Sequence, residues 1–349
     1  MLEKKYKVCV VTVTYGDRFK YLKEVIKSCF EEGIDKIIIV DNASAESSRK
    51  QLRDLQKKYK DKIKLIYLDE NLGSAGGYKK GLEEAYKCKE CEFIWLLDDD
   101  NVPQKGALKK LIEFWKKLKY KEKEKKIALL SFRPDRKIYK MSVLENKTQL
   151  LLGKKNSFLG FHFIDLLGKF WRNIKKRLKK TVSARNTNIK AGIVPVATYG
   201  GLFFHKNLLK IIGFPREEFF LYVDDHEWTY RITKFGGKIF VVFDSIVEDI
   251  ETSWYLKEKK NSSFSPFLST EAQMRIYYSV RNRVIFEREN LVTVPLIYYL
   301  NIFLYKFLLE ISKIFSKDRK IASINLRVFN KAVKNGLKGV TGKNENFNI

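Results

Sequence analysis

The chain has 349 residues and weighs 41.1 kDa, enough for one large domain or for a catalytic domain with a helical appendage. Because 45% of its residues are hydrophobic and 14% aromatic, it can build a sizeable core, which excludes disordered, collagen-like and low-complexity classes. Lys and Arg number 69 and Asp and Glu number 41, so the formal net charge of +28 predicts attraction to polyanions such as nucleic acid, an anionic membrane or a phosphate-bearing substrate.

The N-terminal stretch, MLEKKYKVCVVTVTYG, has neither a long apolar run nor a small-residue cleavage site. The sequence therefore predicts no signal peptide and a cytoplasmic location. Four cysteines are too few for a disulfide scaffold, and only Cys88 and Cys91 form a CxxC pair. Since there is no second pair and histidine occurs only at positions 162, 205 and 226, we do not expect a zinc site.

Strand and helix signals alternate over the first hundred residues. Continuous apolar runs predict strands at 8–14, 36–40, 63–68 and 93–97, and helical periodicity predicts helices at 18–30, 45–59 (N-cap Ser44), 75–88 and 104–118. Continuous apolar strands between helices indicate an α/β fold, with a doubly wound, mostly parallel sheet covered on both faces. Ligands of such sheets bind outside the carboxyl ends of the strands.

Three polar stretches follow these strands and should meet at that edge: Thr14-Tyr15-Gly16, Asp41-Asn42 and Asp98-Asp99-Asp100. Adjacent carboxylates repel one another and therefore need a cation or exposure to water. Mn²⁺ or Mg²⁺ takes hard oxygen ligands, and alternate residues of an extended segment, here Asp98 and Asp100, point the same way. We favour a metal site that bridges to a diphosphate; the alternative is an acidic turn that caps the next helix.

The stretch from Asn71 to Gly81 is a glycine-rich turn that opens the third helix. Glycines permit close backbone approach, and a helix N-terminus favours phosphate. The stretch matches neither the P-loop nor the dinucleotide pattern, so tight packing of the helix against a strand is an equal alternative.

The middle of the chain is less regular. Residues 122–126 suit a charged turn, and 131–195 suit an irregular, basic insertion. Within it, the segment from Phe158 to Lys180 is rich in Phe, Leu and Ile at its front, and from Lys169 onward carries basic residues and no acidic one. Apolar residues followed by a basic cluster suit a helix at an anionic bilayer surface.

Beyond a glycine turn at 200–201 and a helix at 206–212, the run Asp224-Asp225-His226-Glu227 opens an amphipathic segment. Glu227 and Arg231 are four residues apart and can pair on one helix face, while the two Asp residues suit the first turn. In a functional interpretation, one Asp is a general base beside a reacting hydroxyl.

The segment 291–321 is the second candidate for membrane contact. It begins LVTVPLIYYLNIFLYKFLL, nearly all apolar but with Pro295, Asn301 and Lys306. Polar residues then share one helical face and apolar residues the other, with Lys306, Glu310, Lys313, Lys317 and Lys320 opposite Leu304, Phe307, Leu308, Ile311, Ile314 and Phe315. We favour an interfacial helix over a buried helix or a membrane span.

Taken together and in this order, the motifs resemble those of inverting family-2 glycosyltransferases of the GT-A fold, especially the bacterial galactofuranosyl- and rhamnosyl-transferase branch. The matching pieces are VVTVTYGDR, IIIVDNAS, NLGSAGGYKKG, FIWLLDDDNVPQKGAL, ATYGGLFFHKNLLKIIGFPREEFFLYVDDHEWTYRI and YYSVRN. The resemblance implies a nucleotide-sugar-binding half at 1–130, the insertion at 131–195, an acceptor and catalytic-base half at 196–286, and a helical, membrane-associating region at 287–349.

The resemblance also implies a reaction and a set of roles. A sugar would pass, with inversion, from a nucleotide-diphosphate donor (UDP-galactofuranose, dTDP-rhamnose or similar) to a hydroxyl of a lipid-linked or cell-surface glycan. The implied donor site is Thr14, Tyr15, Asp41, Asn42, Asn71, Gly76, Gly77, Asp98 and Asp99; Asp98 and Asp100 would hold Mn²⁺ or Mg²⁺; Asp225 would be the base; and Asp224, His226 and Trp254 would contact the acceptor. Relatives often supply a His ligand after the base, but this chain has FDSIVEDIETSW there, so Asp249 or Glu248 is expected instead.

Many such enzymes act at the inner leaflet, so the resemblance implies a peripheral membrane protein docked through 158–180 and the C-terminal helix. Three alternatives stay open: a related transferase for a soluble or protein acceptor, a nucleotidyltransferase, and a non-catalytic basic nucleic-acid binder. The second lacks its phosphate-binding signature near the first strand. Since the sequence carries no known nucleic-acid signature, we expect no nucleic-acid partner.

Overall fold

The computed structural model describes residues 6–165, 189–251, 267–268, 273–316 and 318–347. Trp254 and the basic run from Lys169 to Lys180 lie outside these ranges, so the roles expected for them stay predictions.

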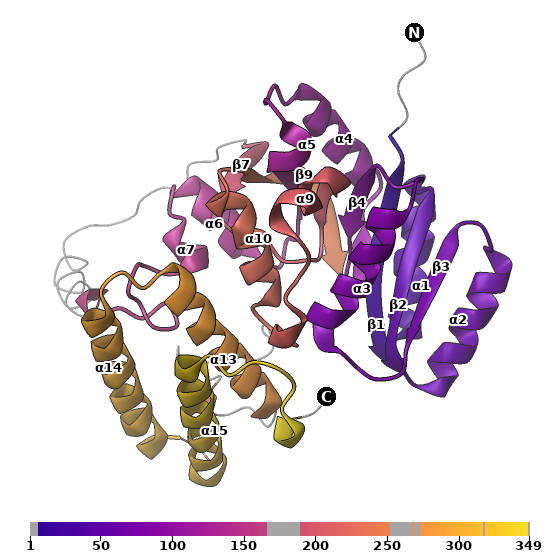
Figure 1. Ribbon diagram of the computed structural model, residues 1–349. Coiled ribbons are helices and arrows are strands. Elements are labelled where there is room, and N and C mark those ends of the chain that lie inside the picture. The colour runs from indigo at the N-terminus through magenta and orange to yellow at the C-terminus, as the bar shows by residue number, and fades with distance from the viewer. Residues whose placement is uncertain (1–5, 166–188, 252–266, 269–272, 317, 348–349) are drawn as a thin grey trace.

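A nine-stranded sheet forms the centre of the described chain (Figure 1), in the order β3-β2-β1-β4-β8-β6-β9-β5 with β7 beside β9. The strands are β1 (Val8–Gly16), β2 (Lys36–Ser44), β3 (Ile63–Leu68), β4 (Phe93–Leu96), β5 (Asn101–Pro103), β6 (Ile127–Phe132), β7 (Ala191–Val194), β8 (Leu202–His205) and β9 (Lys238–Asp249). β1 to β4 pair in parallel, as predicted. β8 runs antiparallel to β4 and β6, and β9 returns parallel to β6, so the sheet is mixed with most strands in one direction.

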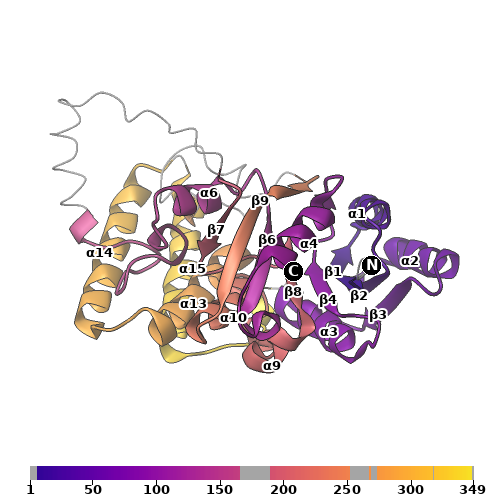
Figure 2. The same ribbon diagram turned by 90° about the horizontal axis from the view of Figure 1, so that it is seen from above.

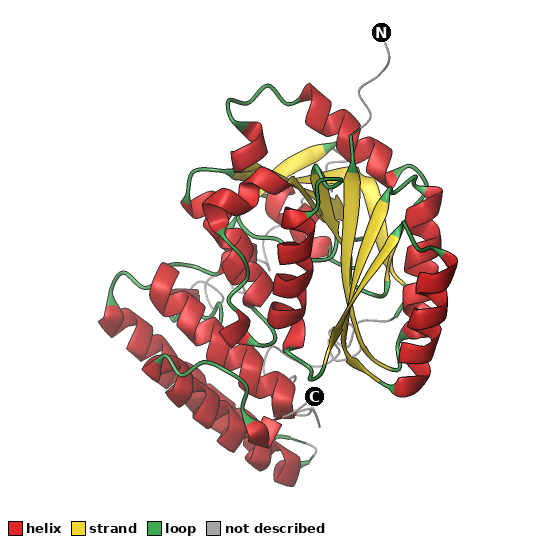
Figure 3. Cartoon of the chain, turned by 45° about the vertical axis from the view of Figure 1, so that its right-hand side comes forward, coloured by secondary structure: helices red, strands yellow, loops and turns green. Residues whose placement is uncertain are grey.

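Helices cover both faces of this sheet (Figure 3). One layer is α1 (Phe19–Glu31), α2 (Glu46–Lys58) and α4 (Ala107–Lys117); the other includes α3 (Gly73–Lys87), α9 (Leu209–Ile212) and α10 (Asp224–Lys234). Leu22, Leu52 and Leu111 are buried on the first face, and Leu82 and Trp228 on the second. Because successive side chains of a strand point to opposite faces, β1 supplies Val8 and Val10 to one core and Cys9 and Val11 to the other. The predicted doubly wound α/β architecture is confirmed.

Two local predictions are wrong. Ser44 does not cap α2: it is the last residue of β2, where its backbone N–H bonds the Asp41 carboxylate at 2.8 Å, and Ala45 precedes the helix without a side-chain cap. The described part of the insertion, residues 131–165 and 189–195, is also more regular than expected, with helices α6 (Lys137–Leu144) and α7 (Gln149–Leu152) before β7. The charged turn at 122–126 likewise contains one helical turn, α5 (Lys123–Lys126).

Three longer helices form a unit beside the sheet, at the opposite end of the molecule from α2 (Figure 2). They are α13 (Gln273–Asn290), α14 (Pro295–Ile314) and α15 (Arg319–Lys338); short 3₁₀ turns lie at Lys206–Leu208, Glu217–Phe219 and Glu345–Phe347. The helical pattern predicted through 321 is interrupted, because Asp318 caps a new helix by accepting the N–H groups of Lys320 and Ile321. No helix within the described ranges combines the length and apolarity that a bilayer crossing requires.

A third hydrophobic core holds this helical unit together. It includes Tyr277, Tyr305 and Phe329, and Phe158 from the insertion is fully buried in it, with its ring centroid 5.3 Å from that of Tyr305. The prediction that the segment beginning at Phe158 faces a membrane is therefore wrong for Phe158 itself. This side chain packs the insertion against the helical unit instead.

Candidate active site

A cavity of about 510 Å³ opens at the carboxyl ends of β1, β2 and β4, the edge predicted for ligands. Its lining includes the predicted residues Tyr15, Asn42, Asn71, Asp98, Asp99, Asp100 and Asp249. A smaller hollow of about 230 Å³ reaches Asp224 and Asp225 and shares Ser74, Asp98 and Arg133 with the first. The two acidic clusters, more than a hundred residues apart in the sequence, therefore face one continuous cleft.

The three aspartates after β4 have different surroundings. Asp98 accepts hydrogen bonds from the Tyr78 hydroxyl (2.7 Å) and the Arg133 guanidinium (3.3 Å), and its side chain is 37% exposed. Asp99 is buried and accepts from the Thr14 hydroxyl (2.8 Å) and Arg18 Nε (2.9 Å). Asp98 thus faces the cleft, whereas Asp99 fixes Arg18 and the end of β1 beneath it.

Asp100 is a carboxyl group that several acidic neighbours surround. Burial, followed by repulsion from Asp98, Asp99 and Asp249, raises its pKa to about 7. Arg18, whose terminal nitrogen lies 3.4 Å from Asp100 Oδ2, offsets only part of this repulsion. A cation at this point would relieve it.

Asp249 and Glu248 of β9 are the two residues expected in place of a metal-binding histidine, and the pairing of β9 with β5 distinguishes them. Asn101 and Asp249 are register partners, and the Asn101 amide donates to Asp249 Oδ1 at 2.8 Å. Glu248, the next residue on β9, bonds Gln104 Nε2 at 2.6 Å and does not line the cleft. Because neighbouring strand residues point to opposite sides, only Asp249 lies at the site.

The carboxylates fit a divalent cation only in part. Asp98, Asp100 and Asp249 supply hard oxygen donors to one cavity, and Arg133 forms an ion pair with both Asp98 and Asp249. Within the described ranges, no three acidic residues bring oxygen atoms within 4.8 Å of one another. The protein therefore offers an open set of ligands, which suits a metal ion that completes its coordination with diphosphate oxygens and water.

One wall of the cleft is built on two asparagines, Asn42 and Asn71. Asn42 Nδ2 donates to Asn71 Oδ1 (2.9 Å) and to the Gly73 carbonyl (3.0 Å), and Asn42 Oδ1 accepts from the Leu72 N–H (2.8 Å). These bonds fix the turn that starts α3, where Gly73 has φ +68° and lies so close to Phe220 that a Cβ would meet its carbonyl oxygen at 2.0 Å.

Four expected donor residues do not line the cleft. Gly76 and Gly77 lie inside α3, where a Cβ on Gly77 would meet Val13 at 2.6 Å, so packing of the helix against β1 explains this glycine. Asp41 is buried and pairs with Arg49 at 2.7 Å, and Thr14 bonds Asp99. These residues lie behind the lining of the cleft and hold the lining residues in place.

Asp224 and Asp225 open α10, as predicted, and Glu227 pairs with Arg231 at 2.6 Å. The Ser74 hydroxyl donates to Asp224 at 2.7 Å, and Asp225 Oδ1 accepts the N–H of His226 at 2.7 Å. Burial is the main cause that raises the pKa of both carboxyls; repulsion from Asp225 adds for Asp224, and repulsion from Asp98 adds for Asp225.

His226 is a poor candidate for acceptor contact. Burial, together with the cationic Arg283 and Arg136, lowers its pKa to about 3, so the imidazole is neutral at physiological pH. It does not line either part of the cleft, whereas its neighbours Asp224 and Asp225 do.

A strained loop precedes the segment that carries Asp224 and Asp225. Phe220, Tyr222 and Val223 have φ values of 63°, 63° and 66°, which non-glycine residues rarely adopt. The Asn282 amide of α13 donates to the carbonyls of Phe219, Leu221 and Tyr222, each at 2.8 Å. The YYSVRN stretch, matched in the sequence without a role, thus holds the loop that carries the aspartates.

The sequence analysis missed the basic lining of the cleft, and it named Gly200 only as part of a turn, without a place in the site. Arg18, Arg133, Arg136 and Arg275 line it. Arg133 follows the carboxyl end of β6, and that position is the signal that was available. A Cβ on Gly200 would lie 2.1 Å from Asn101 Oδ1 and 2.6 Å from Asp98 Oδ2, so any other residue there would displace these side chains.

Comparison with known families agrees with this geometry: residues 9–121 match the family described as glycosyl transferase family 2. Residues 9–121 are thus similar to a family 2 glycosyl transferase domain. The matched residues include Asn42, Asn71 and Asp98 to Asp100, whereas Asp224 and Asp225 lie beyond them.

Individual relatives extend the likeness. The chain is 24% identical over 341 residues to the dTDP-rhamnosyl transferase RfbF of Shigella flexneri, which spans 96% of this chain and 97% of that protein. It is 31% identical over 109 residues to the putative teichuronic acid biosynthesis glycosyltransferase TuaG of Bacillus subtilis, covering 31% of this chain and 41% of that one. The resemblance to bacterial rhamnosyl-transferase-like family-2 enzymes is confirmed.

Among solved structures, GalNAc-T7 with UDP, GalNAc and Mn²⁺ aligns with a TM-score of 0.52 at 13% identity. The alignment covers 81% of this chain and 48% of that one, so the chain spans about half the length of GalNAc-T7. At this identity the likeness concerns the fold alone, and it supports the GT-A fold.

Proposed function

We propose that this chain is an inverting glycosyltransferase that moves a sugar from a nucleoside diphosphate to a hydroxyl of a glycan. The observation that carries the proposal is the continuous cleft, which brings Asp98 to Asp100 and Asp224-Asp225 to the two sides of one space. A donor diphosphate at the first cluster would place its sugar toward the second.

The residues of the cleft divide the work. Tyr15, Asn42 and Asn71 form the wall for the base and ribose, and Arg18 and Arg133 neutralise the carboxylates beside the diphosphate. Mn²⁺ or Mg²⁺, held by Asp98 and Asp100 with Asp249 nearby, would supply charge that stabilises the departing diphosphate.

Asp225 is the general base in this proposal. Ser74 engages Asp224, which leaves Asp225 the less constrained carboxyl of the pair. Its raised pKa matches the task of taking a proton from an acceptor hydroxyl near neutral pH. The oxygen then attacks the anomeric carbon from the side opposite the diphosphate, and the configuration inverts. Asp224 orients the acceptor.

The similarity along nearly the whole chain to a dTDP-rhamnosyl transferase favours dTDP-rhamnose over UDP-galactofuranose as the donor. The name of one relative, the putative teichuronic acid biosynthesis glycosyltransferase, favours a polysaccharide acceptor, and we propose that this acceptor is carried on a lipid during its synthesis. The enzyme would then work on the cytoplasmic face of the membrane as a peripheral protein.

The surface of α14 and α15 supports this location. On α14, large apolar side chains are exposed along one face: Leu296, Tyr299, Leu300, Phe303, Phe307, Ile311 and Ile314. Beside it, α15 carries six exposed basic residues and no acidic one: Arg319, Lys320, Arg327, Lys331, Lys334 and Lys338. An apolar face next to a basic face matches the boundary of an anionic bilayer.

Incubation of the purified chain with a panel of sugar nucleotides, glycan acceptors with free hydroxyls and Mn²⁺, followed by NMR of the product, tests the transferase proposal. We expect one donor to be consumed and the new linkage to have inverted configuration. Asp225→Asn should lower turnover by about 100- to 10,000-fold, the usual contribution of a general base, while donor affinity stays the same.

Asp244→Asn is the matched control, since Asp244 is an exposed aspartate on β9 that does not line the cleft. Near-normal turnover of Asp225→Asn would show that Asp225 is not the general base. Failure of every donor to bind would overturn the transferase proposal itself.

A further inference from the structure

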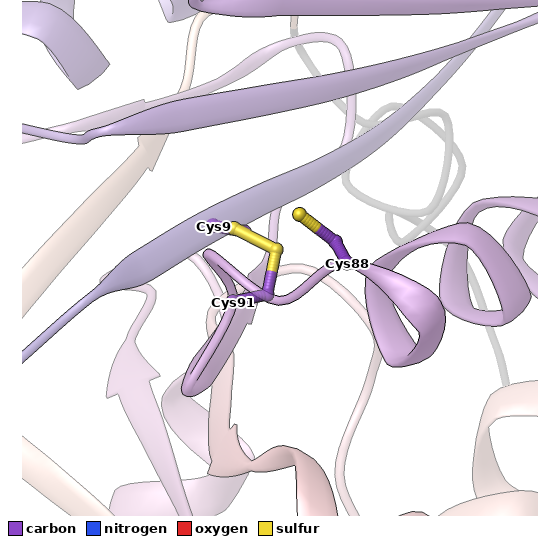
Figure 4. A group of neighbouring side chains, drawn as sticks. All are labelled: Cys9, Cys88 and Cys91. Carbon is purple, nitrogen blue, oxygen red and sulfur yellow. A yellow bond between two sulfur atoms is a disulfide. The ribbon is translucent and has the colours of Figure 1, made fainter.

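Three of the four cysteines, Cys9, Cys88 and Cys91, lie close together (Figure 4), where β1 and β4 begin. Cys9 of β1 and Cys91, just before β4, form a disulfide between residues 82 apart in the sequence. The third sulfur, that of the free Cys88, lies within 4.8 Å of both disulfide sulfurs. The CxxC pair that the sequence left without a role thus meets a partner from the first strand.

The three differ in their access to solvent. Cys9 and Cys91 are 0% and 1% exposed, so an external thiol in solution does not reach their sulfurs in the folded chain. Cys88 is only partly buried, because it ends α3 where the chain turns toward β4. The Cys91 N–H and Lys206 Nζ both donate to the Cys88 carbonyl, at 3.3 and 2.9 Å, which holds this turn in place.

We propose that Cys88 is an exchange thiol, through which external thiols reduce and re-form the buried disulfide. Disulfides exchange only by attack of a thiolate on a sulfur atom, so a buried disulfide needs either unfolding or an internal attacking group. Cys88 is the one cysteine that both contacts solvent and lies beside the disulfide.

The chemical step is balanced within the chain. The Cys88 thiol gives its proton to water, and the thiolate attacks Sγ of Cys91. The Cys9–Cys91 bond breaks, Cys9 leaves as a thiolate and takes up a proton, and a Cys88–Cys91 disulfide results. An external dithiol then reduces this more accessible bond by two electrons and becomes a disulfide itself. In reverse, a small disulfide such as oxidised glutathione re-forms the cross-link.

The exchange bears on the sheet that carries the cleft. The disulfide joins β1 to the segment before β4, and the carboxyl ends of these strands carry Tyr15 and Asp98 to Asp100. A cross-link between distant residues restrains the unfolded chain, so the state of these sulfurs would set the stability of this sheet. The proposal does not depend on the transferase activity.

The test is the rate at which the oxidised, full-length chain loses its disulfide in dithiothreitol, followed by quenched alkylation and peptide mapping. Two alkylatable thiols, Cys29 and Cys88, are expected before reduction. Cys88→Ser should keep the disulfide but slow its reduction by about tenfold or more, since internal attack is lost. Brief exposure of the wild type to exchange conditions should yield a Cys88–Cys91 peptide.

Cys29→Ser is the matched control, because Cys29 is a free cysteine of α1 outside the cluster and should leave the rate unchanged. If Cys88→Ser does not fold, Cys88→Ala replaces it. Reduction of either variant at the wild-type rate would overturn the proposal, as would four free thiols after equilibration with oxidised glutathione.

Discussion

The two carboxyl groups that open α10 show how burial shifts the pKa of an ordinary residue type. Burial raises the pKa of Asp224 and Asp225, and the repulsion of neighbouring carboxylates adds to the shift. A base must be deprotonated, so the turnover should fall as pH decreases from neutral, well before an ordinary aspartate would protonate. A pH profile of kcat that stays flat down to pH near 4 would contradict this.

The same shift makes an opposite prediction for stability. A folded-state pKa above the unfolded value means that protonation favours folding, so this pair stabilises the chain in acid and loses that contribution as pH rises through the folded pKa. Asp224→Asn removes the ionisation. Its Tm relative to wild type should therefore be higher at pH 8 than at pH 5. A pH-independent difference in thermal melts would argue against buried, raised-pKa carboxyls.

Gly200 is required by the space it leaves for other groups. A Cβ there would lie 2.6 Å from both Asp98 Oδ2 and an Arg133 terminal nitrogen, and 2.1 Å from Asn101 Oδ1. Gly200→Ala should displace Asp98 and weaken donor binding in Mn²⁺ by about tenfold or more, since displacements near 1 Å at such sites are costly. Calorimetric titration with the nucleoside diphosphate measures this, and a thermal melt separates it from unfolding. Unchanged affinity would show that Asp98 tolerates the shift.

Helix α13 supports the site by holding the backbone of the loop that precedes Asp224. Asn282 donates to three carbonyls of the loop whose Phe220, Tyr222 and Val223 have positive φ, and this loop ends at Asp224. Strained backbone persists only where surrounding bonds hold it.

Asn282→Ala should therefore lower kcat by about 10- to 100-fold, through misplacement of the base, while the KM for the donor changes little. The substitution should also shift the acid limb of the pH profile, because the surroundings of Asp225, and with them its pKa, would change. Asn290→Ala is the control on the same helix. The Asn290 amide nitrogen donates to the Phe286 carbonyl of α13, and its amide oxygen accepts from the exposed Lys234, so neither bond involves the loop. If both variants match wild type, Asn282 has no positioning role.

The elements predictable from sequence were those with strong periodic patterns. The apolar runs of β1 to β4 and the amphipathic helices between them fix their own structure, so the wall of the cleft at Tyr15, Asn42 and Asp98 followed from strand ends alone. β7, with Ala191 and Gly192 among its four residues, has no pattern and becomes a strand only by pairing with β9. Arg133 and Gly200 matter through contacts across the sheet, which one sequence does not display.

Part of the chain's positive charge, the six exposed basic residues of α15, lies in the same helical unit as an exposed apolar surface. The basic face of α15 adjoins the exposed apolar face of α14, in the helical unit that also holds the base loop through Asn282. A protein docked through this unit would keep the acceptor side of its cleft connected to the bilayer, where a lipid-linked glycan is anchored.

Vesicle flotation tests this arrangement. The wild type should bind vesicles that contain anionic lipid at low salt, and bind less as salt rises, because basic residues supply part of the attraction. Phe303 and Phe307 are 65% and 55% exposed, so Phe303→Glu with Phe307→Glu should leave the fold intact. Removal of two apolar side chains from the interface should lower the vesicle affinity by about tenfold or more. Phe235→Glu, at a phenylalanine 58% exposed just after α10, is the control for charge and residue type. Equal binding by both variants would place the contact elsewhere, and a wild type that ignores anionic vesicles would leave a soluble or protein acceptor as the better proposal.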